Sequence, residues 1–279
     1  MNRAESNLDE ATVRSFGRQW ARFDQSKVPE ETLRRTFSQY FALFPWDQLP
    51  PSAVGADIGC GSGRFSGFAA ERAGMLHLVD ASEGALSVAR ARLSSRPNVV
   101  FHHASVDELP FAEQSLDFAY SLGVLHHVPD TAAAVAAVAR ALRRGAPLLL
   151  YLYYAFENRP AWYRLLWSAS DLARGAIAGL PPAPQSFLCD AIALAIYWPL
   201  ARLARALELA GLDVAAFPLA LYRDRDFYSM RTDARDRFGT PLEKRFRAEE
   251  IRKMMTDAGL ERIRFSDSPP YWCVLGFKS

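Results

Sequence analysis

Apolar positions in the first fifty residues recur at helical spacing. Those from Val13 to Phe23 lie mostly three or four residues apart, which predicts a helix over 9–24. A similar spacing predicts a second helix over 30–44, and three prolines then interrupt the chain before residue 52. We therefore expect residues 1–50 to form an N-terminal helical cap.

Between residues 53 and 153, short and almost wholly apolar runs alternate with helical stretches. The runs predict strands over 53–58, 75–79, 99–102, 116–121 and 147–153. Strands that are apolar throughout and separated by helices indicate a parallel sheet that is covered on both faces. Residues 51–155 are therefore expected to form the open α/β core of the protein.

Residues 156–246 break this alternation and predict a helical insertion. Helices are expected over 160–175 and 186–211, followed by an arginine-rich charged loop over 223–247. The apolar stretch 187–200 is interrupted by an aspartate and a proline, so we expect it to be too short and too broken to cross a membrane.

The core pattern returns after the insertion. A helix is predicted over 248–258, and strands are predicted over 262–266 and 272–277. Because only a short link with two prolines joins these strands, we expect them to pair in antiparallel fashion. Residues 247–279 are thus predicted to complete the core.

Composition and charge exclude several classes of protein. Half of the 279 residues are hydrophobic, so the chain as a whole is not disordered. The 33 basic and 31 acidic residues leave a net charge of +2, which disfavours a nucleic-acid partner. Cys60, Cys189 and Cys273 form no CxxC pair and the first ten residues hold no apolar signal segment, so a cytoplasmic protein is expected.

The strongest local signal is a glycine-rich turn, Asp57-Ile58-Gly59-Cys60-Gly61-Ser62-Gly63, between a predicted strand and a predicted helix. Glycines let the chain turn sharply and approach a ligand at the carboxyl end of a strand, where open α/β sheets bind ligands. A tight strand–helix connection is the alternative. A dinucleotide fingerprint fits poorly, because Arg64 follows the turn where a further glycine is expected and Asp57 would repel a pyrophosphate.

A second carboxylate, Asp80, ends the second predicted strand, where it can accept hydrogen bonds from both hydroxyls of a ribose. Together, Asp57 and Asp80 favour a ligand that carries a ribose and a positive charge. S-adenosylmethionine has both features.

These motifs resemble those of the class I S-adenosylmethionine-dependent methyltransferases, in the small-molecule group with a D-I-G-C-G-x-G first motif. Asp80-Ala81-Ser82 resembles the second motif, Leu109-Pro110-Phe111 the segment after the third strand, and the run from Leu125 to Asp130 the segment after the fourth. The resemblance implies a Rossmann-like, doubly wound, mostly parallel seven-stranded sheet with an antiparallel last strand. It also implies S-adenosylmethionine as cofactor and S-adenosylhomocysteine as product.

The resemblance further implies which residues bind the cofactor. Asp57 would bind the amino group and Asp80 the ribose, whereas Ser105 stands where the family often has an aspartate that contacts the adenine. The implied set is Asp57, Gly59, Cys60, Gly61, Gly63, Asp80, Ala81, Ser105, Val106, Leu122 and Gly123.

The chemistry at the methyl acceptor rests on fewer residues. The turn Ser121–Val124 lacks the (Asn/Asp)-Pro-Pro-aromatic motif of enzymes that methylate amines of nucleic-acid bases. His126 and His127 are candidate general bases, because imidazole titrates near neutral pH. The alternative is that both histidines only pack at the start of a helix.

The insertion and the N-terminal helices are expected to select the acceptor. Apolar helices would roof a bulky apolar acceptor, and the eight basic against five acidic residues of 223–247 would bind an anionic one. The alternatives are that these helices only pack on each other and that the charges of a solvated loop pair with one another. The candidate substrate residues are Trp20, Tyr153, Tyr154, Tyr228, Arg231, Arg237 and Lys244.

The sequence therefore predicts an S-adenosylmethionine-dependent methyltransferase that acts on oxygen, nitrogen or carbon of a small molecule. An RNA methyltransferase and a catalytically silent cofactor-binding protein are the alternatives.

Overall fold

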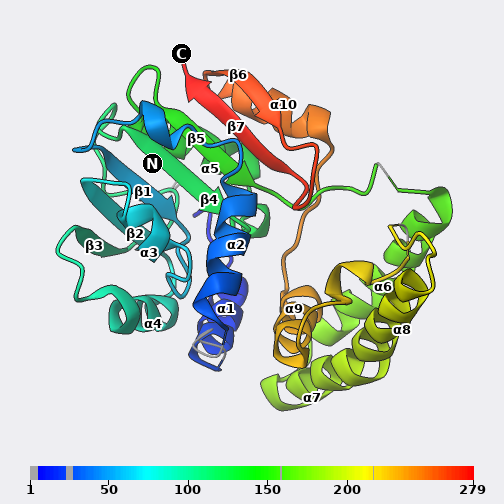
Figure 1. The fold of residues 1–279 in the computed structure, drawn as a ribbon. Coiled ribbons are helices and arrows are strands. Elements are labelled where there is room, and N and C mark those ends of the chain that lie inside the picture. Colours follow the sequence, from blue (N-terminus) through cyan, green and yellow to red (C-terminus); the bar gives the residue numbers. More distant parts are fainter. Residues whose placement is uncertain (1–5, 23–27, 158, 216) are drawn as a thin grey trace. The chain divides into compact units, whose positions relative to one another are not determined.

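The computed structural model describes residues 6–22, 28–157, 159–215 and 217–279 (Figure 1). Phe23, placed by its spacing in the first predicted helix, lies outside the described residues. The contacts divide the chain into two units, which we call the core unit (Met1–Ala155 with Leu242–Ser279) and the helical unit (Phe156–Pro241).

The core unit contains a single seven-stranded sheet with the strand order β3-β2-β1-β4-β5-β7-β6. Its strands are β1 (Val54–Ile58), β2 (Met75–Asp80), β3 (Val99–His103), β4 (Phe118–Leu122), β5 (Pro147–Tyr151), β6 (Leu260–Phe265) and β7 (Cys273–Lys278). The first five strands are parallel, whereas β7 runs antiparallel to both β5 and β6. The predicted mostly parallel sheet with an antiparallel last strand is therefore confirmed.

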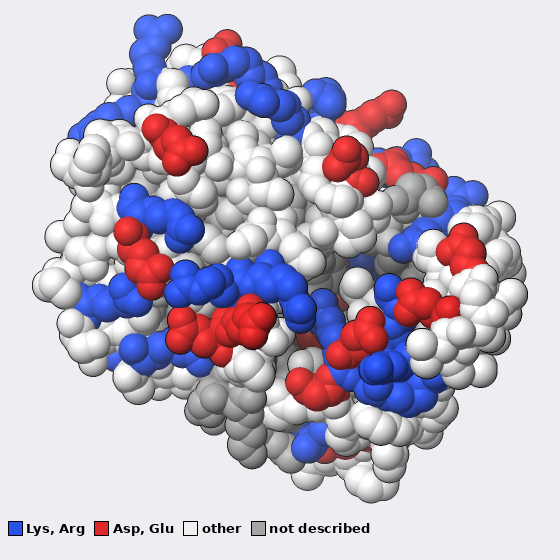
Figure 2. Space-filling view, in the orientation of Figure 1, with Lys and Arg blue, Asp and Glu red and all other residues white. Residues whose placement is uncertain are grey.

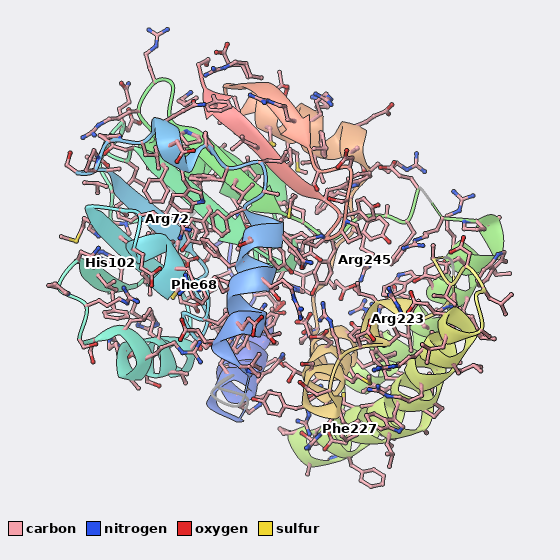
Figure 3. The ribbon with its side chains drawn as sticks, in the orientation of Figure 1. Phe68, Arg72, His102, Arg223, Phe227 and Arg245 are labelled. Atoms are coloured by element: carbon pink, nitrogen blue, oxygen red, sulfur yellow. The ribbon has the colours of Figure 1, made fainter. Side chains whose placement is uncertain are left out.

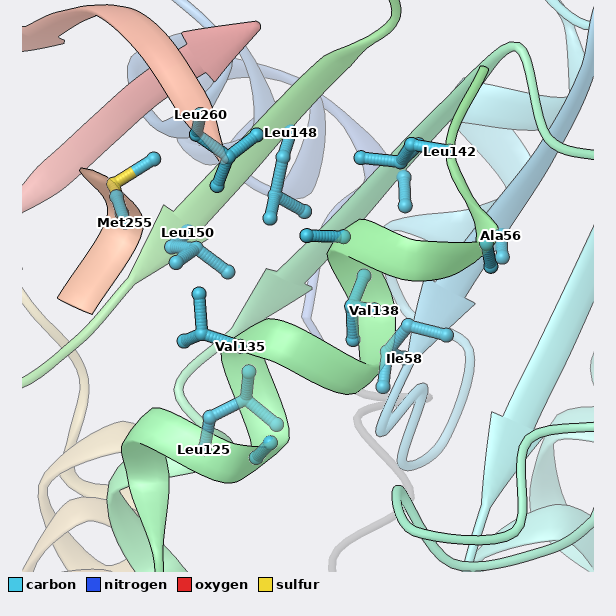
Figure 4. Packing of buried hydrophobic residues seen from close by; sticks show 14 of the residues in the cluster. Ala56, Ile58, Leu125, Val135, Val138, Leu142, Leu148, Leu150, Met255 and Leu260 are labelled. Atoms are coloured by element: carbon cyan, nitrogen blue, oxygen red, sulfur yellow. The ribbon is translucent and has the colours of Figure 1, made fainter. Parts of the chain in front are cut away.

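Helices cover both faces of this sheet. They are α1 (Glu10–Arg22), α2 (Glu30–Tyr40), α3 (Ser66–Ala70), α4 (Glu83–Leu93), α5 (Thr131–Ala141) and α10 (Ala248–Asp257), with short 3-10 helices η1 (Trp46–Gln48) and η2 (Leu125–His127). Because side chains alternate along a strand, Leu148 and Leu150 of β5 pack with α5 and α10 on one face (Figure 4). Leu149 belongs to the hydrophobic cluster on the other face, which also includes residues of α2, α3 and α4.

The strand order brings the carboxyl ends of β1, β2 and β4 together. β1 pairs with β2 on one side and with β4 on the other, so Asp57 has Leu78 and Tyr120 as its neighbours in register. The direction in which successive strands are added to the sheet reverses here, since β2 and β3 lie to one side of β1 whereas β4 and β5 lie to the other. Such switch points are where open α/β sheets bind ligands.

The helical unit consists of α6 (Ala161–Ala178), α7 (Pro182–Ile192), the π-helical turn η3 (Ala193–Tyr197), α8 (Trp198–Leu209), the 3-10 turn η4 (Ala220–Tyr222) and α9 (Phe227–Gly239). The prediction of a loop over 223–247 was wrong for the central part of this segment, which forms α9. Asp226 caps this helix by accepting a hydrogen bond from the Ser229 amide at 2.7 Å. Met230, Ala234 and Phe238 form its buried face, four residues apart.

The expectation that the apolar stretch 187–200 is broken was also wrong. One helical run extends over Pro182–Leu209, 28 residues, with a mean hydropathy of 1.5 in its most apolar window, and by length and composition it is long enough to cross a membrane. The helical run tolerates Pro199 because this residue lies in the first turn of α8, directly after the π-helical turn. The run also tolerates the charge of Asp190, because Arg231 and Arg235 form ion pairs with it at 2.7 and 2.9 Å.

Candidate functional site

The glycine-rich turn that follows β1 has a backbone conformation that requires glycine. Gly59, Gly61 and Gly63 have φ values of +76°, +56° and +66°. The amides of Gly59 and Cys60 both donate to the carbonyl oxygen of Val79, at 2.7 and 3.1 Å. A Cβ atom at Gly59 would lie 2.4 Å from a methyl group of Val124. The turn is thereby held against β2 and against the segment that follows β4.

Asp57 is buried at the end of β1. Its Oδ2 atom accepts hydrogen bonds from the Ser66 hydroxyl at 2.6 Å and from the Tyr120 hydroxyl at 2.9 Å. Burial raises the pKa of Asp57 to about 7, although both hydrogen bonds oppose the shift. Sequence reasoning missed both partners. The one available signal was that Tyr120 lies near the end of a predicted strand, over 116–121.

Asp80 connects the two loops that follow β1 and β2. Its Oδ2 atom accepts from the Gly61 amide and its Oδ1 atom from the Ser82 amide, each at 2.8 Å. Burial raises the pKa of Asp80, against the effect of these two backbone hydrogen bonds. Next to Gly61, the Ser62 hydroxyl is buried and has no hydrogen-bond partner among the described residues.

The other predicted cofactor residues follow the ends of β2, β3 and β4. The carbonyl oxygen of Ala81 lies 3.0 Å from Nε2 of His103. Ser105 hydrogen-bonds Asp107, and the neighbouring Val106 side chain is buried in the core. Gly123, after Leu122 at the end of β4, has a φ of +75° and donates its amide to the Tyr151 carbonyl at 3.0 Å.

Helix α1 lies against the glycine-rich turn. A Cβ atom at Gly61 would lie 3.1 Å from the indole of Trp20, and one at Gly17 would lie 2.6 Å from the Ser82 hydroxyl. The guanidinium group of Arg64 is 5.5 Å from the Trp20 ring. The structure thus places Trp20, predicted as a substrate residue, beside the predicted cofactor loop.

His126 and His127 lie in η2 and are both buried. The centroid of the His126 ring lies 3.9 Å from that of the Tyr153 ring and 4.0 Å from that of the His127 ring, with the rings tilted by 31° and 48°. Burial, His127 and Arg245 together lower the pKa of His126 well below its ordinary value, so this imidazole is neutral at neutral pH.

Nδ1 of His127 lies 2.6 Å from the carbonyl oxygen of Leu242. A carbonyl oxygen can only accept, so this hydrogen bond requires the proton of a neutral His127 to be on Nδ1. Nε2 of His127 then carries the lone pair. This assignment distinguishes the two histidines, which the sequence left equivalent.

The segment Leu242–Phe246 runs beside both histidines. The Lys244 amide donates to the His126 carbonyl at 3.0 Å, and the Phe246 amide donates to the Tyr153 carbonyl at 2.9 Å. Arg245, labelled in Figure 3, lies 4.8 Å from the Tyr153 ring and forms an ion pair with Glu243 at 2.9 Å. No motif in the sequence singled out Glu243 or Arg245.

The remaining candidate residues lie in several different places. The Tyr154 ring contacts the rings of Tyr271 and Trp272. Lys244 donates through Nζ to the Pro129 carbonyl of the core unit.

Tyr228, Arg231 and Arg237 belong to α9 of the helical unit. Arg231 is bound to Asp190. Arg237 is buried, 3.0 Å from Asp171 and 3.7 Å from the Trp167 ring.

Known proteins share both the sequence and the fold of the core. A family model described as a methyltransferase domain matches residues 56–150. A ubiquinone biosynthesis O-methyltransferase of Xanthomonas oryzae pv. oryzae is 32% identical over 180 residues, which are 63% of this chain and 71% of that protein. One of Hahella chejuensis is 39% identical over 102 residues, 36% of this chain and 42% of that protein.

The chain thus matches about two fifths of the length of the first curated relatives, 42% and 39%. Among solved structures, magnesium protoporphyrin IX methyltransferase from Synechocystis PCC 6803 has a TM-score of 0.55 and 16% identity, over 97% of this chain and 100% of that chain. This last similarity concerns the fold alone. By its sequence matches and its fold, the chain belongs to the class I S-adenosylmethionine-dependent methyltransferases.

Proposed function

We propose that this protein binds S-adenosylmethionine at the glycine-rich turn and transfers its methyl group to an oxygen atom of a small molecule. The observation that carries the proposal is the pair of carboxylates, buried Asp57 and half-buried Asp80, on either side of a turn with three left-handed glycines. The choice of oxygen is supported by the relatives named as ubiquinone biosynthesis O-methyltransferases.

The residues present fit this cofactor. The carboxylate of Asp80 can accept from ribose hydroxyls, and the carboxylate of Asp57 favours a cationic group at the end of β1. The buried Ser62 hydroxyl, without a partner among the described residues, is a further donor in the same turn. S-adenosylmethionine supplies a methyl group on an already activated sulfonium, so the protein needs mainly to align the acceptor and remove its proton.

His127 is the proposed general base. Its proton on Nδ1 is held by the Leu242 carbonyl, which leaves Nε2 able to accept a proton from a hydroxyl. His126 is less suited, because its lowered pKa makes it a weak base and its ring packs against that of Tyr153. The helical unit remains the predicted determinant of acceptor choice.

Cofactor binding is expected to become several-fold tighter between pH 6 and pH 7.5. Below its pKa of about 7, Asp57 is mostly protonated, and a cationic ligand must shift it to the carboxylate. Binding at pH 6 should therefore release a proton, and affinity should rise as pH rises. Isothermal titration calorimetry with S-adenosylmethionine, in buffers of different ionisation enthalpy, measures both effects.

The matched control is Asp57→Asn, which keeps the shape of the side chain but cannot ionise. Any pH dependence that remains in this variant belongs to the ligand's own amino group. Absence of binding by the folded wild-type protein would refute the cofactor proposal. Equal pH dependence in both proteins would refute the role of Asp57.

Nuclear magnetic resonance of ¹⁵N-histidine-labelled protein is expected to show His127 with its proton on Nδ1. The same spectra should show His126 neutral at neutral pH and titrating only in acid, because burial lowers its pKa. His127→Asn and His126→Asn assign the signals. A His127 signal with the proton on Nε2 would contradict the proposed base.

Neither alternative function has a specific observation in its favour. Basic side chains lie beside acidic ones on the face shown in Figure 2, and Arg231 and Arg237 of the arginine-rich segment are bound by carboxylates of the helical unit. This arrangement does not favour RNA binding. Transfer of a labelled methyl group to an acceptor in a cell extract separates an active enzyme from a silent cofactor-binding protein.

A further inference from the structure

Three segments close tightly on the glycine-rich turn. In each case, a Cβ atom placed on a glycine of the turn would lie 3.1 Å or less from a side chain of the segment. The pairs are Gly59 with Val124 after β4, Gly63 with Leu93 of α4, and Gly61 with Trp20 of α1. The turn from Cys60 to Gly63 is buried, so a ligand reaches this part of it only when one of the three segments moves.

Two of these segments are fixed in the core. The side chains that α4 buries, each at 4% exposure or less, are Ala85, Leu86, Ala89 and Leu93. Val124 directly precedes Leu125, which is fully buried. Displacing either segment would expose core side chains to water, at a cost of roughly 25 cal/mol per Å² of apolar area.

Helix α1 buries much less. Among the side chains of α1 that the structure describes, only Thr12 and Gln19 are buried, and both are polar. Its larger apolar side chains, Val13, Phe16 and Trp20, are half-buried. Elements with few buried apolar contacts open at the lowest cost in free energy. Of the three segments on the turn, α1 is therefore the one that undocks most easily.

The segment before α1 is held by hydrogen bonds at the surface. The Asn7 side chain exchanges two hydrogen bonds with the backbone of Asp130, at 2.8 and 2.6 Å, and the Asn7 amide donates to Asp107 at 3.1 Å. All three are exposed. Breaking them costs little, because water replaces the lost partner.

Helix α1 meets α4 through glycines. A Cβ atom on Gly17 would lie 2.6 Å from the Ser82 hydroxyl oxygen, and one on Gly84 would lie 3.4 Å from the Cα atom of Gly17. The absence of side chains at both glycines lets the two backbones approach closely, and this approach brings Trp20 onto Gly61. A contact between backbones interlocks few side chains, so α1 can separate from it as a unit.

We propose that α1 is a gate for the cofactor. It undocks from the glycine-rich turn when S-adenosylmethionine enters or leaves, and it closes over the turn when the cofactor is bound. This inference rests on the proposed cofactor site, and it assigns Trp20 to the cover of that site rather than to the methyl acceptor. Lids over ligand sites are drawn from the least stable elements of a fold, and the sparse burial of α1 fits this role.

A disulfide that fixes α1 on the loop after β2 tests the gate. In the double variant Gly17→Cys with Ser82→Cys, the two Cβ atoms would lie 3.9 Å apart, within the range of roughly 3.5–4.5 Å that a disulfide requires. A fixed gate blocks entry and exit alike. Oxidation should therefore slow both association and dissociation of S-adenosylmethionine by about tenfold or more, with little change in equilibrium affinity. Rapid filtration with labelled cofactor measures both rates.

The reduced form of the same variant is the matched control. It carries both substitutions, including the loss of the Ser82 hydroxyl that caps α4, so only the crosslink differs. Reduction should restore fast exchange. Equal rates in the oxidised and reduced forms would overturn the gate, and so would a crosslink that lowers only the affinity. A folded wild type that binds no S-adenosylmethionine would instead refute the proposed cofactor, and the gate with it.

Hydrogen exchange of the wild type tests the gate without any substitution. In the free protein, the amides of α1 should exchange faster than those of α4, and saturating S-adenosylmethionine should slow the exchange of α1. Exchange in α1 as slow as in α4, or exchange that the bound cofactor leaves unchanged, would contradict the gate. This measurement decides the matter even where the double variant fails to fold.

Discussion

Replacing Asp80 with alanine is expected to weaken S-adenosylmethionine binding by about two orders of magnitude or more. The substitution removes a carboxylate acceptor for ribose hydroxyls, and each charge-assisted hydrogen bond contributes roughly 1.5–3 kcal/mol. It also leaves the amides of Gly61 and Ser82 without their acceptor, which releases the glycine-rich turn from the loop after β2. The lost ribose acceptor and the released turn both weaken binding of the cofactor.

Isothermal titration measures this loss, and thermal unfolding shows whether the variant is folded. Asp80→Asn should lower the affinity for S-adenosylmethionine to an intermediate degree, because one acceptor oxygen remains but the negative charge is lost. The matched control is Glu83→Gln, a nearby exposed carboxylate that pairs with Arg90 and contacts neither loop amide. An Asp80→Ala variant with wild-type affinity would exclude Asp80 from the cofactor site.

Replacing Gly59 with alanine is expected to lower the free energy of unfolding by about 2–5 kcal/mol. A left-handed conformation costs a non-glycine residue roughly 1–2 kcal/mol, and forcing an extra methyl group into a packed site costs roughly 1–3 kcal/mol. At Gly59 both costs apply, because φ is +76° and the new Cβ atom would lie 2.4 Å from Val124.

Gly145→Ala is the matched control for the conformational part. Gly145 has a φ of +80°, but a Cβ atom there would meet nothing within 4 Å. Urea unfolding should therefore show that Gly145→Ala lowers the free energy of unfolding by less, roughly 1–2 kcal/mol. Adding Val124→Ala to Gly59→Ala relieves the overlap and should recover part of the stability lost through it. Equal losses at Gly59 and Gly145 would mean that the contact with Val124 has no energetic role.

Most of the core could be predicted from the sequence because its signals are local. Apolar runs of strand length, the glycine-rich turn and the N-caps Ser82 and Asp130 each specify structure within a few residues. The order of these signals along the chain then agrees with one sheet topology. The short link between the last two strands predicted their antiparallel pairing, and Asp57 with Asp80 favoured S-adenosylmethionine. The resemblance to a family added the seven-stranded topology and the set of cofactor-binding residues.

Contacts between distant segments could not be predicted in this way. The hydroxyl of Tyr120 reaches Asp57 across 63 residues of chain, and the carbonyl of Leu242 reaches His127 across 115. Neither partner belongs to a motif, and a backbone carbonyl leaves no signature in residue type. The arginine-rich segment was expected to be a loop because its charges hid the buried stripe Met230, Ala234 and Phe238.

The sequence by itself determined that this chain forms an α/β sheet with a glycine-rich ligand turn flanked by two acidic residues, because hydrophobic period, turn chemistry and residue order are local properties. The tertiary structure alone decided three further features: the raised pKa of Asp57, the proton position on His127 and the pairing of Asp171 in α6 with Arg237 of α9. Burial, a partner carbonyl and the arginines of a separate helix cause them. All three arise from groups that meet only when the chain has folded.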